Sequence, residues 1–220
     1  MEITRELLKN ALESTLLAPD ASEAAVRALV REAVELGFAG VCVPPHLVCA
    51  AVEEALGTPL SVVSVVAFPL GFECVETKAT EISHLLSVGA DEVDAVVNQA
   101  CVKEMDGPKL SRELKTLREA AKGAVLKIIL ETGRHEPAAL HLAARIAVDE
   151  GADFLKTSTG IGVRGATPED VHFLKKIAGT KAGVKASGGI RTPADATALI
   201  NAGADRLGTS AAAAIWREFK

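Results

Sequence analysis

The sequence predicts a single domain over residues 1–220, folded as a closed (β/α)₈ barrel (a TIM barrel) with an extra helix at its N-terminus. Short apolar segments that are typical of strands begin at intervals of 21 to 33 residues, and helical patterns separate nearly every pair. These segments are apolar on both faces, as the buried strands of a parallel sheet are. The chain has eight of them, near residues 14, 40, 61, 92, 125, 153, 183 and 205.

An open, doubly wound sheet is the alternative arrangement of the same elements. Such sheets commonly bind dinucleotides through a GxGxxG segment after the first strand, and this sequence has none there. No linker or low-complexity tract divides the chain into parts. We therefore favour the closed barrel.

The first half of the chain begins with a helix for which Thr4 is a possible cap. Ser22 caps the second helix, and Gly37 ends it. Pro44 and Pro45 close the second strand, and the third strand is rich in β-branched residues. The predicted elements are helix 3–12, strand 14–18, helix 23–36, strand 40–43, helix 46–56, strand 60–68, helix 75–88 and strand 91–97.

The second half begins with Gly107-Pro108, which predicts a break in the connection after the fourth strand. Thr167 and Thr192 each precede a proline, which is typical of the first position of a helix. The phrase Gly-Ala-Asp occurs at 89–91, 151–153 and 203–205, each time where a helix passes into a strand. The predicted elements are helix 110–122, strand 125–131, helix 137–150, strand 153–156, helix 168–178, strand 183–186, helix 193–201, strand 205–207 and a last helix through residue 216.

Composition argues against several classes of partner. The formal net charge is −5 and no long basic run occurs, so we expect no nucleic acid and no membrane partner. No apolar run is long enough to span a membrane and the charged N-terminus is unlike a signal peptide, so we expect a cytoplasmic location. The four cysteines form no CxxC pair and have no metal-like spacing to the histidines, so we expect free thiols, no metal and no cofactor.

One stretch, residues 151–160, holds the side chain best suited to covalent chemistry. Its strand ends in Lys156, and small hydroxylated residues and a glycine follow. Burial disfavours the charged form of a lysine, and a neutral amine attacks carbonyl groups. The plainer interpretation is a strand-end lysine that extends into solvent. The residues that the fold places beside Lys156 decide between these two interpretations.

The C-terminal ends of barrel strands face the active site of such a fold. Strand alternation places Lys156 inward and, one strand further round, Lys185 as well. A second ammonium group lowers the pKa of the first and makes its amine nucleophilic near neutral pH. Asp94, also at a strand end, would transfer protons, although a buried structural carboxylate is an equal alternative for it. Together the three side chains predict Schiff-base chemistry.

Other strand ends supply candidates for contact with a substrate. Cys42 ends the second strand and could line a pocket. Lys127 is a further candidate for substrate binding, but alternation places it on the face of Glu131, and we favour a structural ion pair between the two. For Arg191 we favour a solvated side chain.

Two glycine-containing loops predict a phosphate site. Gly188-Gly189 follows the seventh strand, and Gly208-Thr209-Ser210 follows the eighth and opens a helix. Barrels of this kind commonly bind phosphate between these loops, through backbone N–H groups and a helix N-terminus. Glycine lets the backbone approach the anion, and Ser210 adds a hydroxyl.

The motifs around these residues resemble the deoxyribose-phosphate aldolase family. They are FLKTSTG (154–160), VKASGGIR (184–191), GADEVD (89–94), LKIILETG (126–133) and VCVPPH (41–46), and the resemblance extends nearly from end to end. It implies a class I aldolase on a TIM barrel, a carbon–carbon lyase that needs no metal. Such enzymes reversibly cleave 2-deoxy-D-ribose 5-phosphate to D-glyceraldehyde 3-phosphate and acetaldehyde.

The resemblance also implies roles for the residues. Lys156 would form the Schiff base, Lys185 would perturb the pKa of that amine, and Asp94 would move protons through a water. The two glycine-containing loops would form the phosphate cradle, and Thr159 of FLKTSTG joins the candidates for substrate binding. The partners implied are small phosphorylated sugars and aldehydes, with further copies of the chain in a homo-oligomer, a dimer or tetramer.

The chain departs from the family pattern at several positions. Some members end in a tyrosine that assists proton transfer, and this chain has no Tyr. Some have a lysine where Ile161 stands, a second serine where Ala211 stands, and an aspartate where Glu13 stands. These departures concern the proton relay and the affinity for phosphate, and they leave the expected reaction unchanged.

Two other functions are compatible with the same barrel. A phosphosugar isomerase would need a carboxylate or cysteine base but no covalent amine. A non-catalytic phosphosugar-binding protein would bind its ligand and release no acetaldehyde. The basic residues at three inward strand ends argue against the binding protein.

Overall fold

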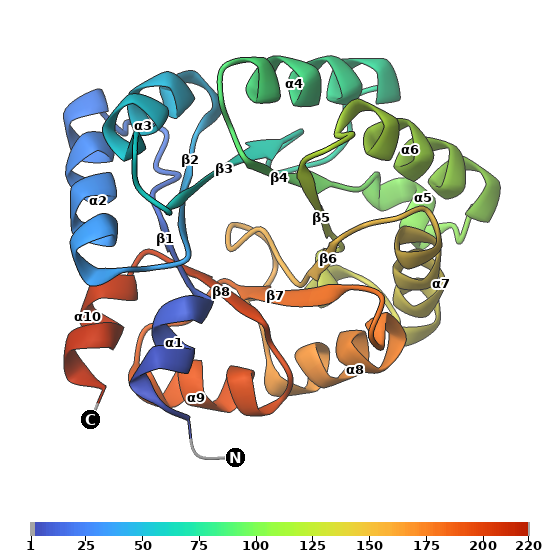
Figure 1. The fold of residues 1–220 in the computed structure, drawn as a ribbon. Helices are drawn as coiled ribbons and strands as arrows, with labels where there is room; N and C mark the ends of the chain where they lie inside the picture. The colour runs from blue at the N-terminus through green and yellow to red at the C-terminus, as the bar shows by residue number, and fades with distance from the viewer. Residues whose placement is uncertain (1–2, 220) are drawn as a thin grey trace.

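A computed structural model describes residues 3–219, and within them eight parallel strands close into a barrel (Figure 1). Each strand pairs with its neighbours in chain order, and the eighth pairs with the first. The predicted fold class is therefore confirmed. The strands are β1 (Leu12–Thr15), β2 (Gly40–Val43), β3 (Ser61–Val66), β4 (Glu92–Val96), β5 (Val125–Ile129), β6 (Phe154–Lys156), β7 (Gly183–Ser187) and β8 (Arg206–Thr209).

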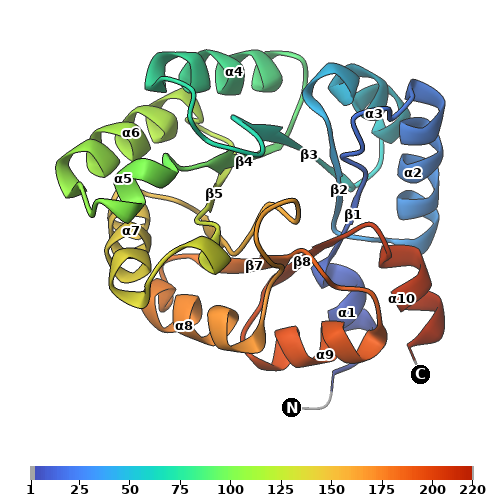
Figure 2. The same ribbon diagram turned by 180° about the vertical axis from the view of Figure 1, so that it is seen from behind.

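Helices surround this barrel on the outside (Figures 1 and 2). The first of them precedes β1 and is the extra N-terminal helix that the sequence predicts. Among the described residues, no helix has both the length and the apolar character needed to cross a membrane. The helices are α1 (Arg5–Ala11), α2 (Glu23–Leu36), η1 (Pro45–Leu47), α3 (Val48–Ala55), α4 (Val75–Ser87), α5 (Gln99–Lys103), α6 (Gly107–Ala120), η2 (Thr132–Arg134), α7 (Pro137–Asp149), α8 (Pro168–Ala178), α9 (Pro193–Asn201) and α10 (Ala212–Glu218).

Side-chain caps begin the helices at the predicted residues. Thr4 and Ser22 accept backbone N–H bonds at the starts of α1 and α2. Thr167 and Thr192 form reciprocal capping boxes with the aspartates three residues later, and a proline follows each threonine. The predicted starts of these four helices are confirmed.

Three local predictions need correction. The first strand begins at Leu12, two residues earlier than predicted, because α1 ends at Ala11 and the chain passes directly into the barrel. Helix α5 has five residues, too few for a periodic pattern, and Asn98 caps it. Gly107-Pro108 does not break the chain: Asp106 caps α6, and the proline takes an early position where its missing N–H costs nothing.

The repeated Gly-Ala-Asp phrase has a structural cause. Each glycine has a positive φ and ends a helix, and each aspartate then ties the start of an even-numbered strand to the strand before it. In every case the aspartate forms two hydrogen bonds with one residue of the preceding strand. The aspartate N–H donates to the backbone carbonyl of that residue, and the N–H of that residue donates to the aspartate carboxylate at 2.8 Å. The pairs are Asp91 with Val62, Asp153 with Leu126, and Asp205 with Val184.

Alternation along the strands separates two environments. On β2, Val41 and Val43 belong to the apolar layer between the barrel and its helices, whereas Cys42 packs inside with Val63 and Val65. Inside the barrel the strand ends are polar, which is where the charged side chains of the next section lie.

A buried ion pair outside the barrel fixes the loop after β3. Lys78 on α4 is fully buried, and its Nζ lies 2.6 Å from Glu113 Oε1. The same ammonium donates to the carbonyl oxygens of Gly71 and Val96, each at 2.8 Å. Lys78 therefore joins the β3–α4 loop, the end of β4 and helix α6.

Lys78→Met is expected to lower the free energy of unfolding by about 3–5 kcal/mol, because it leaves the Glu113 carboxylate buried without its cation. Urea denaturation at pH 7 measures this loss. The double variant Lys78→Met/Glu113→Leu removes both charges and should recover much of it. A single variant as stable as the parent would show that the pair is not a constraint on the fold.

Candidate active site

Three lysines from adjacent strands meet one carboxylate inside the barrel. Lys156 Nζ and Lys185 Nζ both lie 2.7 Å from Asp94 Oδ2, and Lys127 Nζ lies 3.0 Å from Asp94 Oδ1. All four side chains are buried. Four of the strand-end residues singled out from the sequence thus form one hydrogen-bonded cluster.

Strand register explains why these side chains meet. Asp94 on β4 is the register partner of Lys127 on β5, and Lys156 on β6 is the partner of Lys185 on β7. Register partners lie side by side on the same face of a sheet, so each pair points inward together. The prediction that Lys185 lies beside Lys156, one strand further round, is confirmed.

Two further carboxylates complete the cluster, and neither was a predicted site residue. Glu13 on β1 pairs with Lys185, and Glu92 on β4 pairs with Lys127. Glu92 shares the inward face of Asp94, which strand alternation already indicates. Glu13 was placed outside the first strand because that strand was predicted too late in the chain. The available signals were a carboxylate directly before the predicted first strand for Glu13, and a carboxylate two residues before Asp94 for Glu92.

Burial and charge act in opposite directions on the cluster. Burial raises the pKa of Asp94, but the ammonium groups of Lys127, Lys156 and Lys185 outweigh it and hold that pKa well below its usual range. Burial lowers the pKa of Lys185, yet the carboxylates of Asp94 and Glu13 outweigh it and raise that pKa above its ordinary value. Asp94 is therefore ionised and Lys185 protonated at neutral pH.

These shifts predict how stability depends on pH. The contribution of Asp94 is present above its unfolded pKa of about 3.9 and is lost as the pH falls through its lower folded pKa. The contribution of Lys185 is present below its unfolded pKa of about 10.4 and is lost as the pH rises through its higher folded pKa. Urea titrations from pH 2 to 11 should show both losses, and Asp94→Asn should flatten the acid limb. An unchanged acid limb in that variant would contradict the assignment.

A cavity of about 470 Å³ opens above the cluster at the C-terminal ends of the strands. Lys156 lies on its wall, whereas Lys127, Lys185 and Asp94 are fully buried and do not line it. The predicted phosphate residues and Thr159 also line this cavity: Gly188, Gly189, Gly208, Thr209 and Ser210. Arg191, which is exposed at the rim, lines it too. The cavity therefore brings one of the three lysines together with both glycine-containing loops.

Glycines at this site make room for neighbouring groups. A Cβ on Gly208 would lie 3.1 Å from Lys185 Cε, so this glycine leaves space for the buried lysine. A Cβ on Gly188 would lie 2.9 Å from Gly165 Cα and 3.0 Å from Gly160 Cα. The loop after β6 therefore packs backbone against backbone on the loop after β7, and it curls across the centre of the barrel (Figures 1 and 2).

Other candidate residues lie near the cavity in different settings. Cys42 is buried inside the barrel and is not part of the cavity wall. Burial raises the pKa of its thiol to about 11, so the thiol is neutral at pH 7. The Thr209 hydroxyl donates to the Ile190 carbonyl at 2.7 Å, and helix α10 begins at Ala212, later than predicted.

The predicted ion pair between Lys127 and Glu131 is wrong. Lys127 pairs with Asp94 and Glu92, as described above. Strand β5 ends at Ile129, and Glu131 has a left-handed backbone with φ of 55°, so strand alternation no longer applies to it. Its carboxylate accepts the backbone N–H of Thr159 at 3.1 Å instead.

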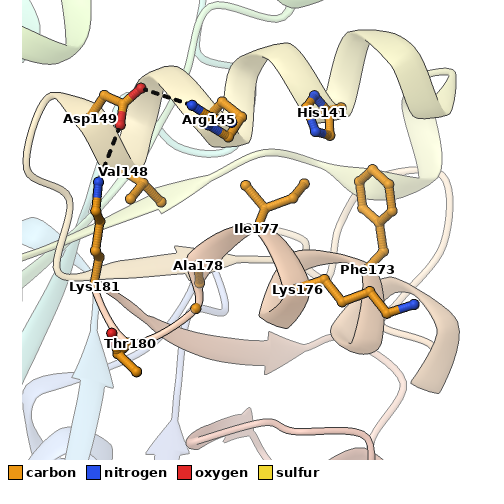
Figure 3. A pocket seen from close by; sticks show the side chains of 11 residues that line it. His141, Arg145, Val148, Asp149, Phe173, Lys176, Ile177, Ala178, Thr180 and Lys181 are labelled. Carbon is orange, nitrogen blue, oxygen red and sulfur yellow. Dashed lines mark ion pairs between the residues drawn. The ribbon is translucent and has the colours of Figure 1, made fainter.

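A larger hollow of about 660 Å³ lies between α7 and α8, outside the barrel (Figure 3). His141, Phe173 and Ile177 are among its walls, and Asp149 forms ion pairs of 3.8 Å with Arg145 and Lys181 there. None of the predicted site residues lines it. We therefore place the candidate active site in the smaller cavity.

The smaller cavity has a lysine amine on its wall. Lys156 has a carboxylate within proton-transfer distance and a second cation on the same carboxylate. Among residues 3–219, no group of three or more His, Cys, Asp or Glu side chains is arranged to hold a metal ion.

Known proteins resemble this chain in both sequence and fold. The profile of the DeoC/LacD family of aldolases matches residues 13–218. A deoxyribose-phosphate aldolase of Thermus thermophilus is 45% identical over 204 residues, which cover 93% of this chain and 93% of that protein.

Solved structures agree with this match. An aldolase named QR15 superimposes with a TM-score of 0.91 at 36% identity, over 96% of this chain and 95% of that chain. A tetrameric deoxyribose phosphate aldolase from Aeropyrum pernix superimposes with a TM-score of 0.88 at 37% identity, over 97% of this chain and 91% of that chain.

Proposed function

This chain belongs to the DeoC/LacD family of aldolases, and on that premise we propose that it reversibly cleaves 2-deoxy-D-ribose 5-phosphate to D-glyceraldehyde 3-phosphate and acetaldehyde. The nucleophile is Lys156, which forms a Schiff base with the substrate. The observation that carries this proposal is the position of Lys156. Its ammonium group lies 2.7 Å from the carboxylate that it shares with Lys185, and its side chain lines the cavity with both glycine-containing loops.

The proposed reaction begins with attack of the Lys156 amine on C1 of the open-chain aldehyde, and loss of water gives an iminium ion. Removal of the proton from the C3 hydroxyl breaks the C2–C3 bond, and its electron pair enters the iminium to give an enamine. Carbons 3 to 5 leave as D-glyceraldehyde 3-phosphate. Protonation of the enamine at C2 and hydrolysis release acetaldehyde and restore the amine.

Asp94 and Lys185 assist different steps in this proposal. Asp94 is ionised at neutral pH and accepts the C3 hydroxyl proton through a water. Lys185 keeps its own proton, and its ammonium group lies on the same Asp94 oxygen as the Lys156 amine. Lys127, which does not line the cavity, balances the carboxylates of Asp94 and Glu92.

The proposed phosphate site lies between Gly188-Gly189 and the Gly208–Ser210 segment. Successive positive φ angles of 85° and 77° at Gly188 and Gly189 turn the backbone beside the cavity, where N–H groups can bind an anion. Arg191 on the rim supplies the cation.

Gly188→Ala tests this site. Its new Cβ would meet the backbones of Gly160 and Gly165, which have little freedom to move, so we expect the KM for 2-deoxy-D-ribose 5-phosphate to rise by about 10- to 100-fold. Gly189→Ala is the matched control, because it has the same strained φ but its Cβ meets nothing within 4 Å. Equal KM values for the two variants would contradict the proposal that these loops bind the phosphate.

An assay for acetaldehyde distinguishes the proposal from its rivals. The protein is incubated with 2-deoxy-D-ribose 5-phosphate, and the aldehyde is reduced by a coupled, NADH-dependent alcohol dehydrogenase. Acetaldehyde release is expected. An isomerase would change the sugar phosphate without releasing acetaldehyde, and a binding protein would leave it unchanged.

The proposal extends to assembly and location. We propose that residues 1–220 form one catalytic domain that assembles as a homo-oligomer, a dimer or tetramer, in the cytoplasm, with no nucleic acid partner. The tetrameric relative from Aeropyrum pernix and the net charge of −5 support it. Light scattering of the purified protein measures the assembly, and a monomer would exclude it.

A further inference from the structure

Glu131 is a buried carboxylate that the reaction proposed above does not use. It is 3% exposed, and among residues 3–219 no cation lies within ion-pair distance of it. Its Oε2 accepts the Thr159 N–H at 3.1 Å, and its Oε1 has no hydrogen-bond partner in the described part of the chain. Burial of a polar oxygen without a hydrogen-bond partner is unfavourable, so stability alone does not explain this residue.

The backbone of Glu131 adds a second unfavourable feature. Its φ of 55° lies in the left-handed region, which non-glycine residues rarely adopt. Conformations of this kind persist where the surroundings impose them, and they are concentrated at functional sites. The next residue, Thr132, donates its N–H to the Thr157 carbonyl at 2.8 Å. The strained turn therefore lies directly against the loop after Lys156.

From Glu131 a chain of hydrogen bonds runs through that loop. Glu131 holds the Thr159 N–H, and the Thr159 hydroxyl oxygen in turn accepts the N–H groups of Ile161 and Gly162, each at 3.1 Å. A Cβ on Gly162 would lie 2.6 Å from Glu131 Oε1, so the loop rests on the carboxylate. Glu131 thus supports the loop at Thr159 and Gly162, whereas residues 157 and 158 bond to strand β7.

This loop separates two cavities. Thr159 and Ile161 line the catalytic cavity, and they also line a neighbouring cavity of about 390 Å³ whose wall includes Glu131 and Gly162. The loop also touches the proposed phosphate cradle, through Gly160 and Gly188. A shift of the loop would therefore change both the cavity wall and the cradle.

We propose that Glu131 is a positioning residue that holds residues 157–162 in place as the wall of the catalytic cavity, by accepting the Thr159 N–H. The proposal rests on the proposed function for its kinetic consequences. Its structural consequence, an ordered loop, does not depend on the substrate.

Glu131→Ala is expected to raise the KM for 2-deoxy-D-ribose 5-phosphate by about 10- to 100-fold, with a smaller change in kcat. Glu131→Gln should restore KM to within about threefold of the parent, because its amide oxygen accepts the same N–H. In Gly162→Ala the new Cβ would clash with the Glu131 carboxylate and displace the loop. This variant should therefore raise KM as Glu131→Ala does. A purely structural residue would lower the melting temperature and leave the KM of the folded fraction unchanged.

Hydrogen exchange of the loop tests the same proposal without substrate. In Glu131→Ala, the amides of Thr159, Ile161 and Gly162 should exchange at least about tenfold faster while the rest of the barrel is unchanged. Asp91→Ala is the matched control: it too removes a carboxylate from a backbone N–H, that of Val62, but away from the loop. Its loop exchange and KM should equal those of the parent.

The outcomes separate the two proposals. Unchanged loop exchange or unchanged KM in Glu131→Ala would overturn the positioning role. If the parent protein cleaves no 2-deoxy-D-ribose 5-phosphate, the proposed function fails, and the exchange experiment alone decides the role of Glu131.

Discussion

Lys156→Met is expected to lower kcat/KM for 2-deoxy-D-ribose 5-phosphate by at least about 10⁴-fold, because it removes the covalent nucleophile. Methionine is unbranched and close to lysine in length, so it fills the same space beside the cavity. Asp94 keeps its bonds to Lys127 and Lys185, so the folded barrel should persist. The rate of acetaldehyde release measures the loss, and circular dichroism checks the fold.

Lys127→Met is the matched control for this variant. It removes a lysine bound to the same carboxylate, but one that is buried and does not line the cavity. It should lower stability and still form an adduct on Lys156. Comparable residual activity in the two variants would contradict the assignment of Lys156 as the nucleophile.

Asp94→Asn is expected to affect stability and activity together. Asp94 is the carboxylate that three ammonium groups share, and its removal leaves them facing an uncharged amide. We expect the free energy of unfolding at pH 7 to fall by about 3–5 kcal/mol. We also expect kcat/KM to fall by about 10²- to 10⁴-fold, since the proton acceptor is lost.

The control for Asp94→Asn is Asp91→Asn, at the residue directly before the same strand. Asp91 accepts the Val62 N–H at 2.8 Å, and an asparagine oxygen accepts it equally well. Urea denaturation should show a loss below about 1 kcal/mol, and activity should be unchanged. If Asp94→Asn is as stable and active as this control, the carboxylate is not the centre of the cluster.

The alternation of side chains along strands was the most useful basis for predicting the site from the sequence. It placed Asp94, Lys156 and Lys185 inward at strand ends, and the register pairs Lys156 with Lys185 as expected. The period of the apolar segments predicted the closed barrel, because a parallel strand buried on both faces differs clearly from an amphipathic helix. The aspartates of the repeated Gly-Ala-Asp phrase bond neighbouring strands, which the sequence did not show.

The predictions that failed have a common physical reason: a local pattern does not show where a strand begins or ends. Glu13 joined the cluster because β1 begins at Leu12, two residues before the predicted start. Glu131 does not lie on the predicted face of the strand, because the backbone turns into a left-handed conformation after β5. Such a turn is imposed by tertiary contacts, here the hydrogen bond to Thr159. That residue lies 28 positions away in the sequence, so a local pattern does not show the contact.

The central claim is that Lys156 forms the Schiff base, and borohydride trapping tests it most directly. The protein is incubated with 2-deoxy-D-ribose 5-phosphate, reduced with borohydride, digested, and the modified peptide is mapped by mass spectrometry. We expect a stable adduct on Lys156, the lysine that lines the cavity. An adduct on Lys185, or substrate turnover without any adduct, would contradict the claim.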